Sequence, residues 1–133
     1  MVAPITAVFA AVTGLLLLVL SAHVVKYRLK YRQGLGVNND PDFEASVRAH
    51  ANLIEHAPLG LLMLGLAEIN GVSATLVYWS GMALVVGRIL HAWGMINGRG
   101  GPHKARMIGI LLTWLSILVV AILLLWNVWQ VHG

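Results

Sequence analysis

The sequence contains no cysteine and few charged residues. Only 11% of its 133 residues are Asp, Glu, Lys or Arg, whereas soluble globular domains carry about 25%. The lack of cysteine excludes disulfides, thiolate metal ligands and a cysteine nucleophile. The low charge, beside a hydrophobic content of 59%, excludes an ordinary cytosolic enzyme or extracellular module, because so much apolar surface could not be kept soluble. The composition is typical of a membrane protein.

Four apolar windows, separated by short segments rich in Gly, Asn and Pro, predict four transmembrane helices. A hydrocarbon core about 30 Å thick needs about 20 apolar helical residues per span. Asp40 before Pro41 predicts the start of the second helix, because Asp caps free amides and Pro suits a first helical turn. We therefore expect an all-α, integral membrane four-helix bundle that forms a single domain over residues 1–133, with helices at about 3–33, 42–70, 72–97 and 104–131.

The basic residues cluster at two of the three connections between these helices. The second connection and both termini contain no Lys or Arg. Cytoplasmic loops of membrane proteins are enriched in Lys and Arg, so we expect the basic loops in the cytoplasm and both termini on the non-cytoplasmic side. No nucleic-acid partner is expected, because no basic residue belongs to a soluble domain; attraction to anionic lipid headgroups is expected of the first loop. The basic residues in and beside the two loops are Lys26, Arg28, Lys30, Arg32, Arg99, Lys104 and Arg106.

A polar stripe runs along the first half of the second predicted helix. Arg48, Asn52 and Glu55 are spaced at i, i+4 and i+7, which places them on one helical face, with Glu44 one turn earlier. Ionisable residues at membrane depth cost about 2.5–3.5 kcal/mol each on insertion scales. A cluster of them therefore needs a structural or functional explanation.

Two explanations of the stripe remain open from the residues alone. In the first, the charges neutralise one another and hold the helices together. In the second, the surplus of cations binds a small anion, and Asn52 adds an uncharged donor and acceptor suited to a peptide-like group. No metal site is expected, because the histidines of the second helix point to different faces and no metal-binding motif occurs. The cations near this level are Arg28, Arg48, Arg88, Lys104 and Arg106, and the acids are Glu44 and Glu55.

The segment RAHANLIEHAP at residues 48–58 resembles the signature RAxxNxxExxP of the MAPEG superfamily, the membrane-associated proteins of eicosanoid and glutathione metabolism. The segment GRILHAWG at residues 87–94 and the arginine that opens the fourth helix extend the likeness. The sequence looks most similar to small bacterial members related to microsomal glutathione transferases. The resemblance implies a homotrimer in the bacterial inner membrane that binds glutathione between neighbouring subunits near the cytoplasmic side.

The resemblance also implies roles for individual residues. Arg106 would be the catalytic residue that faces the thiol and stabilises its anion, with Lys104 as the rival for that position. Arg28 and Arg48 would hold glutathione carboxylates. Glu55 would receive the ammonium or orient an arginine. Glutathione, as co-substrate, would attack lipophilic electrophiles or reduce hydroperoxides. The residues implied to bind glutathione are Arg28, Arg48, Asn52, Glu55, His91 and Lys104.

Two other functions fit the same pattern. A noncatalytic protein that binds lipids or acts as a scaffold is favoured by Met95 and Leu29, which stand where several family members have a tyrosine and a second arginine. A small four-helix transporter is suggested by the size of the chain and by Glu55 at membrane depth. A transporter of this kind often carries an inverted repeat, and we find none in the sequence.

Overall fold

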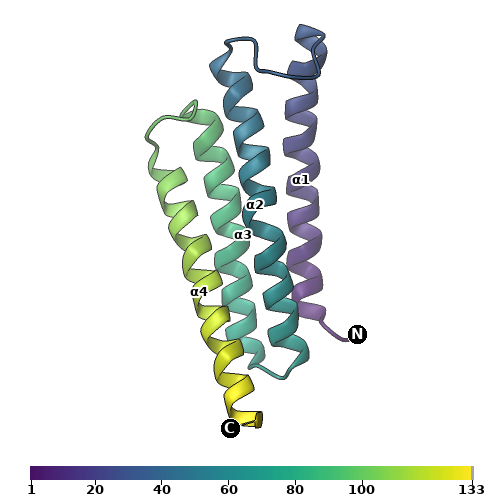
Figure 1. Ribbon diagram of the computed structural model, residues 1–133, viewed down its shortest axis with the longest axis vertical. Coiled ribbons are helices and arrows are strands. Elements are labelled where there is room, and N and C mark those ends of the chain that lie inside the picture. Colours follow the sequence, from purple (N-terminus) through teal and green to yellow (C-terminus); the bar gives the residue numbers. More distant parts are fainter. Residues whose placement is uncertain (133) are drawn as a thin grey trace.

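The computed structural model describes residues 1–132. Its four α-helices run side by side along the long axis of the molecule (Figure 1), and both termini lie toward the same end. This arrangement confirms the prediction of an all-α chain with four helices. In chain order the helices are α1 (Pro4–Tyr31), α2 (Pro41–Ile69), α3 (Ala74–Asn97) and α4 (Lys104–His132).

Three of the helices, α1, α3 and α4, are long and apolar enough to cross a membrane, so the chain is an integral membrane protein. The fourth, α2, carries the polar stripe and packs against all three of the others. By contrast, α1 and α4 lie at opposite edges of the bundle (Figure 1) and make no contact with each other within residues 1–132. In a single chain this packing shields the polar stripe of α2 only in part, because Asn52 is partly buried whereas Glu44, Arg48 and Glu55 are exposed.

The turn from α1 to α2 is fixed by Asp40. One oxygen of its carboxylate accepts hydrogen bonds from the backbone amides of Asp42 and Phe43 at 2.9 and 3.2 Å, as expected for the first residue of a helix. The other oxygen accepts from the Tyr31 hydroxyl at 2.5 Å. This hydroxyl, together with the two amides, lowers the pKa of the Asp40 carboxyl. The expected start of the second helix at this position is confirmed.

The opposite end of α1 is capped by a side chain of α2. The Glu68 carboxylate accepts hydrogen bonds from the backbone nitrogens of Ile5 and Thr6 at 2.9 and 2.8 Å, and from the Thr6 hydroxyl at 2.7 Å. The first amides of a helix have no intrahelical acceptor, and an anion there is favoured by the helix dipole. Side-chain hydrogen bonds therefore stabilise the α1–α2 hairpin at both ends, through Asp40 at one end and Glu68 at the other.

Glycines bring α3 and α4 into close contact. A Cβ atom on Gly109 would lie 2.4 Å from the backbone nitrogen of His91, and one on Gly87 would lie 2.8 Å from the carbonyl oxygen of Gly109. Small residues allow helix backbones to approach in this way within membranes. The contact places the first turns of α4 directly beside the last turns of α3, where several of the expected site residues lie.

Candidate functional site

A polar cavity of about 380 Å³ lies at the end of the bundle where α3 turns into α4. Its size is within the range of about 300–1,000 Å³ that is usual for small-molecule sites. Three helices and one loop form it, with α2 supplying most of the polar wall. The lining residues are Glu44, Ala45, Arg48 and Asn52 of α2, His91 and Met95 of α3, Arg99 and Gly100 of the loop, and Arg106 of α4.

The α2 wall follows the spacing seen in the sequence. Glu44, Arg48 and Asn52 are one helical turn apart and all line the cavity. Glu55 does not line it; its Oε1 lies 3.9 Å from Nη2 of Arg48, and both side chains are half exposed. An exposed ion pair of this length contributes little to stability, so it leaves Arg48 able to turn toward a ligand.

On α3, His91 and Met95 form the inner wall and are almost fully buried. Arg88, one turn before His91, is 2% exposed and does not line the cavity. Its Nε donates to the Thr113 hydroxyl at 2.7 Å, and its Nη1 donates to Oδ1 of Asn52. Arg88 therefore links α2, α3 and α4 directly behind the cavity wall.

Of the two basic residues that open α4, Arg106 lines the cavity and Lys104 does not. Nη1 of Arg106 donates to the carbonyl oxygens of Gly100 and Gly101 at 2.5 and 3.2 Å, so the side chain lies along the loop that borders the cavity. Lys104 is exposed and borders a separate surface depression together with Pro102 and His103. The structure thus brings Arg106 to the candidate site and places Lys104 outside it.

Arg28 also lies outside the cavity of a single chain. Its Nη1 donates to the carbonyl oxygen of Gly36 at 2.7 Å, and its guanidinium carbon lies 4.7 Å from the centre of the Phe43 ring. This cation–π contact holds the arginine over the start of α2. The residue that follows Phe43 is Glu44, which does line the cavity.

Sequence reasoning did not assign Arg99 or Thr113 to the site. The sequence indicates only that Arg99 adds charge to a basic loop; in the structure Arg99 has a positive φ of 49° and lines the cavity. Its Nε lies 2.8 Å from Oδ1 of Asp42. Thr113 lies in an aliphatic helix and carries no sequence signal; only the packing of α4 on α3 reveals that it accepts a hydrogen bond from Arg88.

The charges of the cavity favour an anionic ligand. Three guanidinium groups and one carboxylate line it, from Arg48, Arg99, Arg106 and Glu44. Guanidinium groups bind carboxylates in a planar, often bidentate geometry. The single glutamate and the Asn52 amide add sites for an ammonium and for a peptide group. The arrangement therefore suits a small zwitterion with more than one carboxylate.

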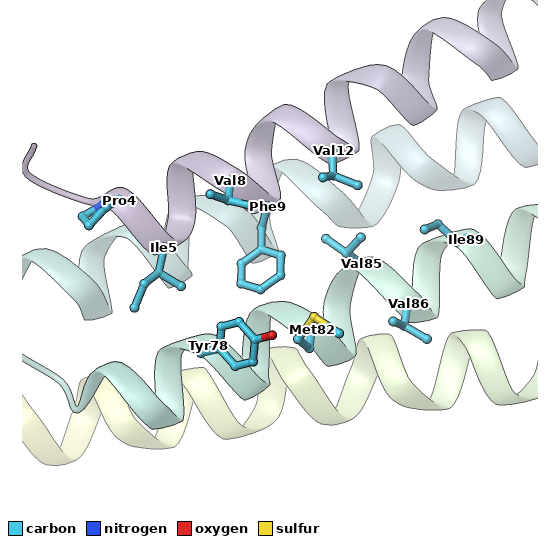
Figure 2. Close-up of a pocket in the computed structure, with 10 residues that line it drawn as sticks. All are labelled: Pro4, Ile5, Val8, Phe9, Val12, Tyr78, Met82, Val85, Val86 and Ile89. Carbon is cyan, nitrogen blue, oxygen red and sulfur yellow. The ribbon is translucent and has the colours of Figure 1, made fainter.

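A second cavity, of about 560 Å³, lies between α1 and α3 (Figure 2). Apolar side chains line it almost entirely, and the Tyr78 hydroxyl is the exception. Along α3 its lining ends at Ile89, whereas the lining of the polar cavity begins at His91. Because α1 and α3 are both apolar enough to span a membrane, this groove offers space for an apolar molecule. Its other lining residues are Pro4, Ile5, Val8, Phe9, Val12, Met82, Val85 and Val86.

Known proteins resemble the chain along nearly its whole length. The sequence matches the MAPEG family over residues 6–126. The inner membrane protein YecN of Escherichia coli strain K12 is 28% identical over 122 residues, which are 92% of this chain and 91% of the relative. YecN of Escherichia coli O6:H1 strain CFT073 shows the same identity and coverage. The name of this relative states a location and no activity.

Proposed function

The chain belongs to the MAPEG family, and we propose that it is a membrane glutathione transferase that acts on lipophilic electrophiles. The observation that carries the proposal is the polar cavity, in which one glutamate, one asparagine and one arginine of α2 meet an arginine of the α3–α4 loop and an arginine of α4. Glutathione has two carboxylates, one ammonium, two peptide groups and a thiol. The cavity offers a chemically matched partner for both carboxylates, the ammonium, one peptide group and the thiol.

We assign the binding groups as follows. Arg48 and Arg99 receive carboxylates, Glu44 receives the ammonium, and Asn52 pairs with a peptide group. Arg28 and Glu55 lie outside the cavity of one chain, and His91 forms its inner wall. In the homotrimer that we propose, glutathione lies between neighbouring copies, and Arg28 and the half-exposed Glu55 contribute from the surfaces where copies meet.

Arg106 supplies the activation step. A free thiol has a pKa of about 8.5 and is mostly protonated at neutral pH. A guanidinium at short range favours the thiolate, so the thiol proton leaves to solvent. The thiolate sulfur then forms a bond to the electrophilic carbon, and the leaving group departs with its bonding electrons. With a hydroperoxide, two glutathione molecules would instead be oxidised to the disulfide while the hydroperoxide is reduced to an alcohol and water.

The electrophile would enter from the bilayer. The similarity to an inner membrane protein supports the same location for this chain, and the basic loops support a cavity that opens toward the cytoplasm. Glutathione would then arrive from the cytoplasm, whereas an apolar partner dissolved in lipid would reach the sulfur sideways between helices.

Stopped-flow ultraviolet absorbance of the thiolate tests the proposal. Purified protein in detergent is mixed with glutathione, beside the variants Arg106→Ala and Lys104→Ala. We expect a saturable thiolate signal in the native protein and in Lys104→Ala, and none in Arg106→Ala. An unchanged signal in Arg106→Ala would refute the role of Arg106. If the native protein shows neither the thiolate signal nor glutathione binding, the proposed transferase function is refuted.

The apolar groove between α1 and α3 (Figure 2) favours a second candidate, a lipid-binding or scaffold protein without turnover. Met95 supports it, because a thioether in the cavity wall offers a reacting sulfur little hydrogen bonding. In that case lipid would be retained during purification and glutathione would not bind. Mass spectrometry of the protein purified in detergent, combined with glutathione titration, separates the two functions.

A further inference from the structure

Arg88 is the largest fully buried side chain of the protein. No ion pair is formed by it within residues 1–132. A buried guanidinium without a carboxylate depends on neutral acceptors, because an unpartnered charge in a low dielectric is strongly unfavourable. Thr113 and Asn52 provide these acceptors for Nε and Nη1. The third nitrogen, Nη2, is buried and has no partner among the residues described.

The chemistry of a guanidinium determines how both partners are oriented. All of its N–H groups donate and none accepts. The Thr113 hydroxyl uses its own hydrogen on the carbonyl oxygen of Gly109, at 2.8 Å, so its lone pairs remain for Arg88. Asn52 must likewise turn Oδ1 toward Arg88, because the opposite amide orientation would place its Nδ2 donor against another donor.

The same orientation decides what Asn52 offers to the cavity. Asn52 is partly buried and lines the cavity, while its Oδ1 is already engaged by Arg88. Its Nδ2 therefore remains to meet a ligand. We propose that Arg88 is a positioning residue that holds the Asn52 amide with its donor toward the cavity, so that the ligand atom beside Asn52 is a carbonyl or carboxylate oxygen.

This inference rests on the proposed function, in which glutathione occupies the cavity, and it makes that function more specific. Each peptide group of glutathione carries both a carbonyl acceptor and an N–H donor. Asn52 held by Arg88 selects the carbonyl and opposes a pose that presents the N–H, because two facing donors would both remain unpaired. Arg88 thus acts on a ligand that it does not touch.

A binding cycle tests the positioning role. Glutathione affinity is measured by calorimetry in detergent for the native protein, Asn52→Ala, Arg88→Met and the double variant. We expect each single variant to weaken binding about tenfold and the double variant to lose no more, since the two residues act as one unit. Relative to Arg88→Met, we expect Arg88→Lys to restore more glutathione affinity than Arg88→Gln, because lysine only donates hydrogen bonds whereas glutamine can also accept them. Native affinity in Arg88→Met, or losses that multiply in the double variant, would overturn the inference.

A measurement without ligand separates this inference from the proposed function. Asn52→Asp places a carboxylate beside the buried guanidinium, so we expect a higher melting temperature than in the native protein. In the Arg88→Met background, the same change should lower the melting temperature. If the native protein does not bind glutathione, the transferase proposal fails, and these melting temperatures still test the contact. If the native protein binds glutathione but Asn52→Asp changes the melting temperature equally in the native and Arg88→Met proteins, the inference fails and the proposed function stands.

Discussion

A Cβ atom on Gly94 of α3 would lie 2.3 Å from the backbone nitrogen of Arg106 on α4. Nothing larger than hydrogen fits between the two helices at this position, so the location of Arg106 in the cavity wall depends on a glycine on the neighbouring helix. Small residues of this kind let helix backbones approach closely within membranes. The backbone of Arg106, and with it the base of its side chain, is fixed relative to His91 before any ligand binds.

Gly94→Ala should therefore force α3 and α4 apart. We expect a loss of about 1–3 kcal/mol in unfolding free energy, typical of overpacking, and weaker glutathione binding because Arg106 shifts. Gly14→Ala is the matched control, since nothing lies within 4 Å of a Cβ at Gly14; it should be neutral or stabilising by up to about 1 kcal/mol. Thermal unfolding in detergent measures both changes. Equal stability of the two variants would contradict the close contact.

Arg99→Ala tests a residue that only the structure assigns to the cavity. Removal of one guanidinium that receives a carboxylate should weaken glutathione binding about tenfold, or about 1.4 kcal/mol. Folding should be little affected, because its ion pair with Asp42 is exposed and such pairs contribute about 0–1 kcal/mol. Arg32→Ala, in the other basic loop, removes the same charge away from the cavity and serves as the control. If both variants lose the same affinity, the effect is one of net charge alone.

Glu68→Ala removes the cap from the start of α1. The backbone amides of Ile5 and Thr6 lose their acceptor, so we expect about 1–2 kcal/mol lower stability, the magnitude of a lost helix cap, and faster hydrogen exchange at these two amides. Glu55→Ala also removes one carboxylate of α2, but from an exposed pair at 3.9 Å, and should change stability by less than about 1 kcal/mol. Unchanged exchange at Ile5 and Thr6 in Glu68→Ala would show that the cap has no effect.

The Asp40 carboxyl should make stability depend on pH. Its pKa in the folded protein is lowered, first by the Tyr31 hydroxyl, relative to an unfolded value of about 3.9. A lowered folded pKa stabilises the fold at pH values above the unfolded pKa, and this stabilisation is lost as the pH falls through the folded pKa. Tyr31→Phe should therefore reduce the loss of folding stability between about pH 5 and pH 2. Melting curves across this range, with Tyr78→Phe as the control, measure the effect; identical acid sensitivity of Tyr31→Phe and the native protein would refute it.

The helices and the start of the site were predictable because their signals are local. Long apolar windows, the Asp40 cap and the turn-rich connections each act within a few residues, and they predicted four helices. The spacing of Arg48, Asn52 and Glu55, with Glu44 one turn earlier, predicted one polar face; Glu44, Arg48 and Asn52 line the cavity and Glu55 does not. The family resemblance implied His91 and Arg106 as site residues, and both line the cavity.

The rest depends on contacts between elements. Whether Lys104 or Arg106 reaches the cavity is decided by the rotation of α4, which the close contact at Gly94 sets. Arg99 reaches it through the path of a loop, and Thr113 through the packing of two helices. Arg88 was counted with the cations of the site, yet it is buried behind the wall. These outcomes depend on three-dimensional packing, for which hydropathy and spacing carry no signal.

The polarity of α2 also bears on how the chain enters a membrane during synthesis. Of the four helices, α2 alone is not apolar enough to cross by itself, and it follows a strongly apolar helix and precedes another. Since isolated charges are unfavourable in lipid, we expect α2 to integrate only in company with α1 or α3. Its side-chain links to α1 through Glu68 and to α3 through Arg88 would then assemble in the order in which the helices leave the translocation channel.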